Sequence, residues 1–402
     1  EGIDPDAGQV HVAGRPPVGY DIASLDIGIT SDLPMLPGFA DHAIPAKPLG
    51  GYAERWAQFL YAVEAGQTPP TIAILGAGVG GVELALAMDH RLRGFADFPI
   101  DLGGEWIHTD PDILKTLSEA SALSLGVIDY NPKTLTRWNG YNLRPVNWMS
   151  RFYWEYKFHR ATWYGFFDAY VAPLSRPYTV LNAPVQTIDT RGSGVRVTLY
   201  DGRVDEADAV ICTVPITILQ QNRIRFLPDL PDHTRDGLNS IVMGDGVKVF
   251  LRFKERFYPD VVMFDNVLEL LLGSDPKIYY DAAFGKGSQD HVLGLFAVDH
   301  TARPYTQLDH NGILRRVLGE LDDIFDGEAS RCYLDHFIQN WSAEPWIRGG
   351  YSSDWDEDPR RVLAPRDGRL FFAGEALGGD HQATVHGAAF SGADAAEMLR
   401  QS

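Results

Sequence analysis

The C-terminal part of this chain most constrains its fold, because residues 369–399 predict a buried strand, a loop and a long helix rich in small residues. Leu370 to Ala373 form a short apolar run, Gly374 permits close backbone approach, and Glu375 follows at the carboxyl end of the strand. The helix is expected to begin near Thr384, so that its free N–H groups face negative charge. This order of elements predicts a docking place for a bulky anionic cofactor, whereas plain packing is the alternative for a glycine-rich turn taken alone.

A second glycine-rich turn lies in TIAILGAGVGGVELALAMD, residues 71–89. A β-rich run leads into Gly76, Gly78 and Gly81, and an Ala/Leu helix pattern follows. The glycines allow a tight turn, backbone approach to a pyrophosphate and close packing of helix on strand, so the pattern predicts a dinucleotide-binding turn. The second strand of such a unit, which ends in an acidic residue roughly 20 positions later, is not visible in the sequence up to His108.

Two further segments have clear secondary-structure patterns. LNAPVQTID and VRVTLYDGRVDEADAVICTVP alternate apolar and polar residues, and Asp201-Gly202 predicts a hairpin turn before a buried strand over residues 209–214. Apolar residues at helical intervals predict an amphipathic helix within residues 301–330 that supports a sheet. These residues are Ile313, Leu314, Val317, Leu318 and Leu321.

The composition indicates a folded chain of two or more domains. Of the 402 residues 45% are hydrophobic, and we expect no membrane span, because no apolar run approaches the ~20 residues that a span needs. The formal net charge is −19, with 35 basic against 54 acidic residues and no basic cluster. This charge argues against nucleic acid and anionic membrane surfaces as partners, and it would attract a cationic substrate.

Cysteine usage is sparse. Cys212 and Cys332 lie far apart and form no CxxC motif, which argues against a disulfide framework, a structural zinc site and a vicinal redox dithiol. We therefore expect no metal site, and a reducing, cytoplasmic compartment fits the pattern. Because the chain begins at Glu1 without a Met or a signal-peptide pattern, we expect a partial or trimmed N-terminus.

The sequence before residue 95 resembles one known superfamily. GRPPVGYDIASLDIG, LPGFADHAIPAKPL and ILGAGVGGVELA are similar to segments of pyridine nucleotide-disulfide reductases, in particular type II NADH dehydrogenase-like proteins. The resemblance implies that the glycine turn is a second nucleotide site, for NAD.

Residues 95–402 resemble a different family. DLGGEWIH, MGDGVKVFLRF, NWSAEPWIRGGYS, and FFAGE followed by TVHGA are similar to segments of flavin amine oxidases. The resemblance implies FAD as cofactor, bound non-covalently because no cysteine falls in these segments. The family's own N-terminal glycine loop and ribose-binding Glu are not visible in matching form. We therefore interpret the chain as a fusion, natural or artefactual, in which one glycine turn stands in for another.

Together the two resemblances imply an α/β fold, with a Rossmann-like FAD/NAD(P)-binding domain and a second, mixed-sheet α+β substrate domain. Residues 1–94 would be the reductase-like segment that ends in the glycine turn. Within residues 95–402, the expected FAD-contacting parts are 95–125, 180–245 and 355–402, and the expected substrate domain comprises 126–179 and 246–354.

The amine-oxidase resemblance assigns cofactor contacts to several segments. The two glycines of DLGGEWIH let the backbone pass against a flat ring that Trp106 can wall, although a glycine turn before a core tryptophan is the alternative. The backbone of Val185 matches the adenine contact, a role compatible with the edge of a core strand. The expected cofactor-binding residues are Gly76, Gly78, Gly81, Gly103, Gly104, Glu105, Trp106, Val185, Trp341, Gly374, Glu375, Thr384 and Val385.

Lys248 is the predicted catalytic residue. It lies near the start of a strand among apolar neighbours, so its ammonium either reaches solvent or is held toward a polar site. An ordinary solvated lysine is the alternative. In the family that the segment resembles, the matching lysine reaches the flavin N5 through a water. A cation there would favour electron density on the reduced flavin and help to position dioxygen reduction.

The same resemblance implies an aromatic substrate cage. Tyr351 would form one side of it and Trp341 would pack near the flavin, while Thr384 matches the second aromatic position, as in polyamine- and lysine-directed members. Trp346 and His381 could line the entrance, a structural hydrogen-bonding role being the alternative for the histidine. Aromatic walls suit a neutral amine, because they desolvate it and stabilise developing iminium charge.

We therefore predict an FAD-dependent amine oxidase. Hydride would pass from the carbon next to a deprotonated amine to flavin N5, and dioxygen would reoxidise the flavin with release of hydrogen peroxide and an imine. A small-molecule amine and O2 are the expected partners, and the oligomeric state stays open. The alternatives are an NAD(P)H dehydrogenase that draws on residues 1–94, a non-catalytic scaffold that keeps the oxidase fold, and an artefactual join that folds poorly.

Overall fold

A computed structural model of the chain divides it into two compact units, Glu1–Phe95 and Ala96–Ser402. The structure describes residues 2–4, 9–11, 18–19, 22–25, 43–45, 49–64, 67, 72–75, 95–107, 126–151, 155–264, 277–354, 356–365 and 368–402. The predicted glycine turn at Gly76, Gly78 and Gly81 lies outside the described residues, as does His108.

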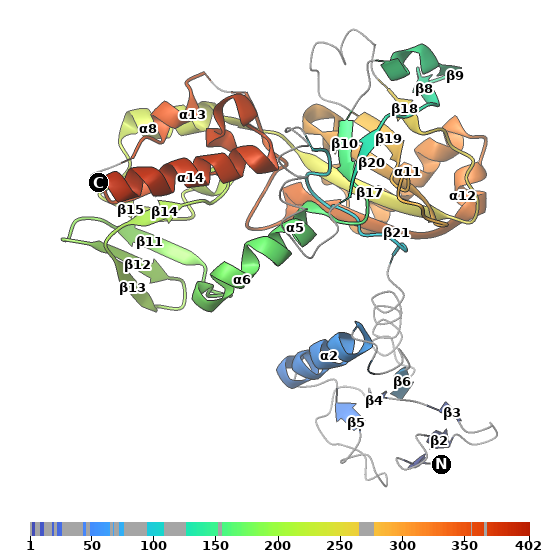
Figure 1. The fold of residues 1–402 in the computed structure, drawn as a ribbon, viewed down its shortest axis with the longest axis horizontal. Coiled ribbons are helices and arrows are strands. Elements are labelled where there is room, and N and C mark those ends of the chain that lie inside the picture. The colour runs from blue at the N-terminus through green and yellow to red at the C-terminus, as the bar shows by residue number, and fades with distance from the viewer. Residues whose placement is uncertain are drawn as a thin grey trace. The chain divides into compact units, whose positions relative to one another are not determined.

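Among its described residues, the first unit contains two small sheets and one helix, which are labelled in Figure 1. β4 pairs in parallel with both β5 and β6, and β6 ends at Leu75, directly before the glycine turn. Parallel neighbours require a crossover connection, and the helix α2 lies between β5 and β6 in the sequence. The elements are β1 (Gly2–Asp4), β2 (Gln9–His11), β3 (Val18–Gly19), β4 (Ile22–Leu25), β5 (Ala43–Pro45), α2 (Leu49–Glu64) and β6 (Ile72–Leu75).

The largest sheet of the second unit has seven strands in the order β21-β17-β20-β19-β18-β8-β9. All neighbours are antiparallel except β18 and β8, which are parallel, so the sheet is mixed. The strands are β8 (Leu135–Trp138), β9 (Leu143–Pro145), β17 (Gly246–Phe253), β18 (Val261–Met263), β19 (Lys277–Asp281), β20 (His291–Val298) and β21 (Tyr333–Asn340).

Two helices, α11 (His310–Ile324) and α12 (Glu328–Cys332), follow β20 and pack against this sheet. Asp309 caps α11 by accepting the N–H of Gly312 at 2.7 Å. Ile313, Val317 and Leu321 are fully buried in the core that the helix shares with β17, β19 and β20. The predicted amphipathic helix within residues 301–330 is therefore confirmed, and its apolar stripe supports the sheet as expected.

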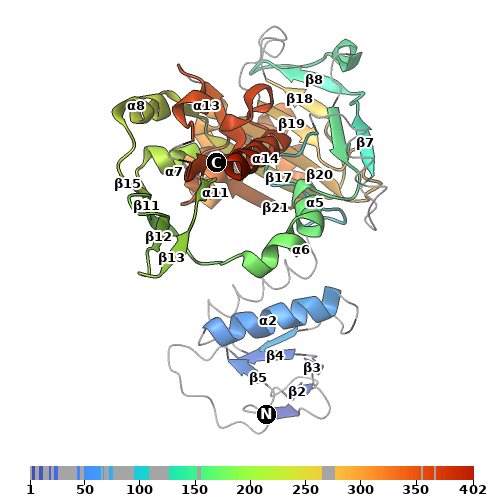
Figure 2. The same cartoon turned by 60° about the vertical axis from the view of Figure 1, so that its left-hand side comes forward.

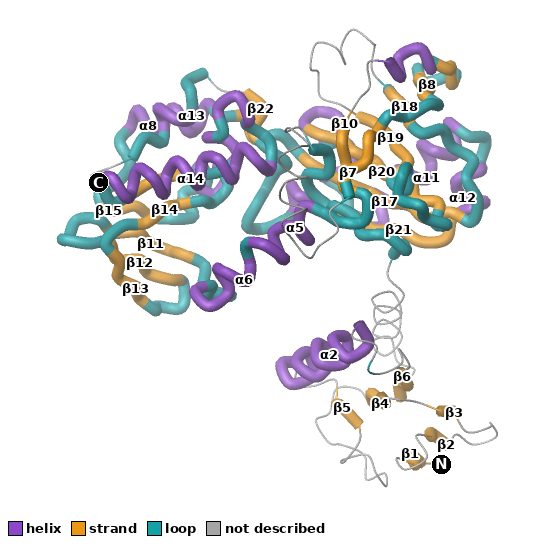
Figure 3. Tube along the Cα trace, in the orientation of Figure 1, coloured by secondary structure: helices purple, strands orange, loops and turns teal. Residues whose placement is uncertain are grey.

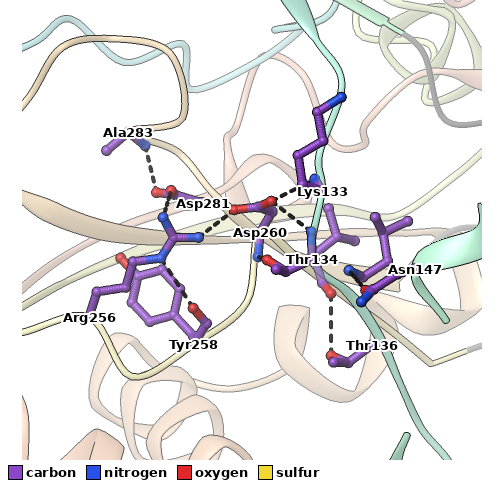
Figure 4. Close-up of polar contacts among 11 residues, drawn as sticks. Lys133, Thr134, Thr136, Asn147, Arg256, Tyr258, Asp260, Asp281 and Ala283 are labelled. Atoms are coloured by element: carbon purple, nitrogen blue, oxygen red, sulfur yellow. Dashed lines mark hydrogen bonds and ion pairs between the residues drawn. The ribbon is translucent and has the colours of Figure 1, made fainter. Parts of the chain in front are cut away.

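A polar network fastens β8 to β18 and β19 (Figure 4). The Asp260 carboxylate accepts the backbone N–H groups of Lys133 at 2.7 Å and Thr134 at 2.9 Å. The guanidinium of Arg256 bonds Asp260 and lies 3.0 Å from a carboxylate oxygen of Asp281. Because the two acids share one cation, the parallel β8 strand is held by charge as well as by its ladder.

The second part of the same unit contains a four-stranded sheet, β13-β12-β11-β15, and a parallel pair, β14 with β23. Gly202 has φ 86° at the turn between β12 and β13, which confirms the predicted Asp201-Gly202 hairpin. The predicted buried strand over 209–214 corresponds to β14. The strands are β11 (Val185–Asp189), β12 (Val195–Leu199), β13 (Val204–Ala207), β14 (Val210–Cys212), β15 (Arg225–Leu227) and β23 (Leu370–Phe372).

Helices cover these strands, as Figure 3 shows in purple. The longest, α14 (Val385–Gln401), begins directly after Thr384, whose side chain accepts the N–H of Gly387 as the N-cap. The predicted C-terminal strand and helix are thus both confirmed in place. The remaining helices here are α7 (Ile216–Gln220), α8 (Asp232–Ser240) and α13 (Pro359–Val362), with the 3-10 turns η5 (Glu375–Leu377) and η6 (Gly379–His381).

Short helices and strands complete the second unit. In Figure 2, α5 and α6 lead from the large sheet toward the β11–β13 sheet. They are α5 (Trp163–Tyr170), α6 (Ala172–Ser175) and η2 (Arg176–Tyr178); the others are β7 (Val127–Tyr130), η1 (Asn147–Arg151), β10 (Glu155–Phe158), β16 (Val242–Met243), η3 (Asp299–Thr301), α10 (Arg303–Thr306), η4 (Trp341–Ala343) and β22 (Ser352–Asp354). Among the described residues, no helix combines the length and apolar character needed to cross a membrane.

Candidate active site

A cavity of about 1050 Å³ lies within the second unit. This volume is at the upper end of the range for small-molecule and cofactor sites, roughly 300–1,000 Å³. Its walls are mainly aromatic, aliphatic and glycine residues. The lining comprises Leu102, Gly103, Gly104, Glu105, Trp106, Met149, Glu155, Phe167, Gly246, Val247, Lys248, Ile278, Phe296, Ala297, Val298, Trp341, Ile347, Gly350, Tyr351, Glu375, Ala383, Thr384, Val385, Ala388 and Ala389.

The cavity brings together most of the predicted site residues of the second unit. Ten of them line it: Gly103, Gly104, Glu105, Trp106, Lys248, Trp341, Tyr351, Glu375, Thr384 and Val385. They come from the loop 101–107, from β17, from the segment 341–351 and from the segment 375–385, which runs from η5 to the start of α14. Four segments that are distant in the sequence therefore meet at one hollow.

Four predicted residues are not part of this lining. Val185 begins β11, and Gly374 lies at the end of β23 with φ 153°. The ring of Trp346 is 51% exposed and stacks under the guanidinium of Arg223 at 5.6 Å. His381 ends η6, where its ring packs against other side chains of the α14 start.

The loop 101–107 is fixed against the cavity by its backbone. The indole N–H of Trp341 donates to the carbonyl of Leu102 at 2.8 Å, and that of Trp163 donates to the carbonyl of Trp106 at 3.4 Å. A Cβ on Gly104 would lie 2.9 Å from Cγ2 of Val385, so only glycine allows the loop to approach α14 this closely. Packing against Val385 therefore requires glycine at position 104.

Trp106 presents a buried indole nitrogen that has no hydrogen-bond partner among the described residues. Its ring lines the cavity and packs edge-on against Tyr280 and Phe296, with centroids at 5.0 and 5.6 Å. Buried donors are rarely left unpaired in folded proteins. A bound group with an acceptor atom would satisfy this nitrogen.

Lys248 is buried, with its side chain only 3% exposed, and it is one of the residues that line the cavity. The strand β17 places it opposite Phe296 on β20 and Gln339 on β21. The ammonium donates to the backbone carbonyl of Asp101 at 3.0 Å and to Oε2 of Glu105 at 2.9 Å. The alternative of an ordinary solvated lysine is therefore excluded by the structure.

Glu105 is the centre of a buried ionic cluster. Its Oε1 atom lies 2.5 Å from Nζ of Lys157, and its Oε2 atom accepts hydrogen bonds from Lys248 and from the hydroxyl of Tyr280. Burial opposes ionisation of this carboxyl, but the ammoniums of Lys157 and Lys248 outweigh it and hold its pKa well below the usual range. Glu105 is therefore a carboxylate that presents its charge to two lysines.

Two more titratable groups border this cluster. Burial, and secondly the negative charge of Glu105, raise the pKa of the Asp101 carboxyl to about 7, although it accepts the N–H of Trp163 at 3.1 Å. Burial and the charge of Lys157 lower the pKa of Lys286 to about 8, and its ammonium bonds the carbonyl of Phe158.

A second carboxyl group, Glu375, lies at the other end of the lining. It accepts the N–H of Ser352 at 3.1 Å, the hydroxyl of the same serine at 2.8 Å and the N–H of Ala383 at 3.1 Å. Burial raises its pKa above the usual value. Glu375 thus ties the turn before α14 to β22, and it holds the helix start next to the cavity.

Several lining residues were not selected from the sequence. They are mainly apolar side chains of the large sheet and of the segment 126–179, together with Glu155. Lys157, which pairs with Glu105, also comes from that segment, on β10. Both charged residues alternate with aromatic ones in YWEYKFHR, and a charge within an apolar strand is the same signal that selected Lys248.

The only cluster of potential metal ligands among the described residues lies away from the cavity. Sγ of Cys332 is 3.5 Å from a carboxylate oxygen of Glu255 and 3.8 Å from one of Glu328. The guanidinium of Arg331 bonds both carboxylates. The positive charge of Arg331 therefore already pairs with the two carboxylates that a metal ion would need.

The cavity fits the ring end of a flavin. Its lining includes the indole rings of Trp106 and Trp341, the buried Trp106 N–H that has no hydrogen-bond partner among the described residues, and Lys248. The first turn of α14 faces it with Thr384 and Val385, where free N–H groups and the helix dipole favour electron-rich groups. Neither Cys212 nor Cys332 lines the cavity, so a thioether link has no donor there.

Comparison with known proteins gives one family. The model of the flavin containing amine oxidoreductases matches residues 178–399. Among curated relatives, a lysine-specific histone demethylase 1B of Mus musculus is 30% identical over 224 residues, which cover 54% of this chain and 27% of that protein. Polyamine oxidases 5 and 4 of Oryza sativa subsp. japonica are 31% and 32% identical, over 58% and 55% of this chain and 47% and 45% of their own lengths.

The chain spans less than half the length of each of these relatives. The match to the family lies in the second unit, and the resemblance of residues 1–94 to reductases stays a prediction. The predicted flavin amine oxidase resemblance and its FAD cofactor are confirmed, since more than half of the sequence matches. The chain belongs to the family of flavin containing amine oxidoreductases.

Proposed function

We propose that this protein oxidises a small cationic amine with bound FAD. The observation that carries the proposal is the convergence, in one cavity, of a buried lysine, three aromatic walls and the N-terminus of a long helix. Lys248, Trp106, and the pair Trp341 and Tyr351 come from three separate segments, and an apolar core would not need an ammonium among them. Membership of the family supports the same reaction class.

FAD would be held by backbone and by the helix start. Gly103 and Gly104 would pass along the flavin ring, Trp106 would donate its orphan N–H, and Thr384 with Val385 would present the first turn of α14. Bound FAD would supply hydride-accepting redox chemistry, by which an amine is oxidised to an imine and dioxygen is reduced, with two electrons and two protons, to hydrogen peroxide.

The chain's own residues would prepare the amine. Trp341 and Tyr351 exclude water, which favours the deprotonated amine that can release a hydride, and their ring faces stabilise the positive charge that develops on the product. Lys248 would stand at the flavin edge with its proton fixed by Glu105 and by the carbonyl of Asp101. A fixed cation there stabilises negative charge as it forms.

Among amines, we propose a substrate with more than one amino group. Glu155 on β10 is one of three glutamates in the cavity lining, with Glu105 and Glu375. An acidic lining, together with the net charge of −19, would attract a substrate that carries more than one positive charge. The names of the relatives, polyamine oxidases and lysine-specific demethylases, are compatible with an aliphatic amine of this kind.

A Rossmann-like fold for the nucleotide end of FAD belongs to the same proposal. The parallel pair β14 and β23, followed by α14, supports it, because parallel strands with a helix at their carboxyl ends are typical of nucleotide-binding sheets. Val185 as an adenine contact and Gly76, Gly78 and Gly81 as a nucleotide turn stay predictions of the sequence.

One spectroscopic experiment tests the function. The purified protein is supplied with FAD, and its visible spectrum is followed under argon with spermine, tyramine, an L-amino acid and NADH in separate arms. We expect flavin bands that bleach fastest with spermine and recover on admitting air, with one peroxide formed per flavin reoxidised. Bleaching by NADH alone would select the dehydrogenase, and a protein that stays colourless with FAD would contradict the proposal.

A further inference from the structure

Lys157 has no role in the proposed reaction so far, although it belongs to the same ionic cluster as Lys248. We propose that Lys157 is a positioning residue: by pairing with one oxygen of Glu105, it leaves the other oxygen to hold the Lys248 ammonium at the cavity wall. For its kinetic readout this inference rests on the proposed function.

The inference rests on the geometry of three side chains, Lys157, Glu105 and Lys248, which we call the triad. Nζ of Lys157 lies 2.5 Å from Oε1 of Glu105, and Nζ of Lys248 lies 2.9 Å from Oε2 of the same carboxylate. The three side chains are 0%, 8% and 3% exposed in the order Lys157, Glu105, Lys248. The two oxygens of Glu105 therefore bind different lysines: Lys248, which lines the cavity, and Lys157, which does not.

Three aromatic rings surround the ammonium of Lys157. Nζ of Lys157 lies 4.8 Å from the ring centroid of Tyr130, 5.0 Å from that of Tyr280 and 5.6 Å from that of Trp106. Nζ of Lys248 is also 5.6 Å from the Trp106 centroid. Both ammoniums thus contact the indole that walls the cavity, and cation–π attraction helps to offset the loss of water around Lys157.

Charge balance explains why two lysines are needed. A buried one-to-one pair of Glu105 and Lys248 would be neutral and closed on itself, and both carboxylate oxygens could turn toward Lys248. With Lys157 present, the triad carries one positive charge in excess, and Oε1 is engaged away from the cavity. Buried ion pairs are weak evidence for stability, so their retention next to a reaction site favours a role in placement.

The structure provides a matched control. Lys277 on β19 is a half-buried lysine in the second unit: it pairs with Glu320 at 2.6 Å and lies 4.0 Å from the ring centroid of Phe264. It does not line the cavity. Lys277→Met therefore removes a caged lysine–glutamate pair of the same kind without changing the triad.

Three variants of the full chain test the inference: Lys157→Met, the double variant Lys157→Met/Glu105→Gln, and Lys277→Met. The first readout is the rate at which trinitrobenzenesulfonate labels Lys248, measured by peptide mass spectrometry on protein with or without FAD. The second readouts are the reduction potential of bound FAD and the values of kcat and KM with the amine that bleaches it.

In Lys157→Met, we expect labelling of Lys248 to slow several-fold, because Glu105 then holds its ammonium with both oxygens. The flavin potential should become more negative, since one nearby positive charge is lost, and kcat should fall on the order of tenfold with little change in KM. The double variant restores the charge total, so its potential should return toward wild type and its labelling rate should reach or exceed the wild-type rate. Lys277→Met should match wild type in all readouts.

Two outcomes would overturn the inference: unchanged labelling of Lys248 in Lys157→Met, or equal effects in Lys277→Met. If Lys157→Met is insoluble, the double variant decides, and slower labelling of Lys248 than in wild type would then overturn the inference. Wild-type protein that binds no FAD, or whose FAD no amine reduces, would instead contradict the proposed function. The labelling experiment would still give its own answer in that case.

Discussion

At the scale of single residues, the sequence predicts those members of the candidate site whose side chain breaks the local pattern. Lys248 was visible because it interrupts an apolar strand, and the structure buries it beside Glu105. Lys157 gives the same signal, but its partner lies 52 positions away, and no local pattern predicts that pairing. Trp346 shows the converse, since a motif position selected it and the structure leaves half of its surface exposed.

Lys248→Met should keep bound flavin and slow turnover on the order of 100-fold, because methionine fills the same volume without the fixed positive charge. The half-reaction rates with amine and with dioxygen, measured by stopped flow, show which step is affected. Lys254→Met is the matched control, since Lys254 is exposed just beyond the end of the same strand. Full activity of Lys248→Met would remove this lysine from the mechanism.

Asp101 should make the fold less stable as pH rises from about 4 to about 7. Its folded pKa of about 7 lies above the unfolded value, so the native state binds a proton that the unfolded state has lost. Its contribution is therefore fully present below pH 4 and declines by ~1.4 kcal/mol per pH unit through that window.

Asp101→Asn removes this titration, while its side-chain oxygen can still accept the N–H of Trp163. Urea unfolding between pH 4 and pH 7 should show the stability of the variant rising relative to wild type across the window. A constant difference between the two proteins would mean that the carboxyl is ionised throughout.

At the scale of elements, local patterns were sufficient where one face or one turn decided the structure. The strand over 370–373, the helix from Thr384, the hairpin at Asp201-Gly202 and the helix over 310–324 all follow from periodicity and capping. The cavity wall from residues 126–179 did not, because aromatic residues at close spacing fit both a core and a site. Which strand contributes Glu155 depends on the pairing of β10 with β7, which is set by tertiary contacts.

Two glycine variants should have opposite effects on stability. Gly104→Ala should lower the melting temperature, because the added Cβ would lie 2.9 Å from Cγ2 of Val385 and push the loop 101–107 off α14. Gly319→Ala in α11 should raise stability by about 0.5–1 kcal/mol, since no atom lies within 4 Å of its Cβ and alanine favours helix.

Thermal melts of both variants beside wild type check the glycine prediction. A stabilised Gly104→Ala protein would show that the loop has room to spare. In that case, close approach to the helix would not be the reason for glycine at this position.

At the scale of the whole molecule, the two compact units limit what one sequence motif can imply. The glycine turn at Gly76, Gly78 and Gly81 predicts a nucleotide site, yet it follows β6 of the first unit, which pairs with β4 beside β5. The cavity and the family match both lie in the second unit. A strand before a glycine turn and a helix after it are local features of the sequence. Whether the turn belongs to a binding site depends on which compact unit its strand joins.

Calorimetry of the full chain should therefore show more than one unfolding transition. Glu1–Phe95 and Ala96–Ser402 form two compact units, so we expect them to unfold independently. Adding FAD should raise the larger transition alone, by RT ln(1 + [FAD]/Kd), because a ligand stabilises only the unit that binds it. A single transition that shifts as a whole would show that both units share the cofactor, and a broad melt insensitive to FAD would favour a poorly folded join.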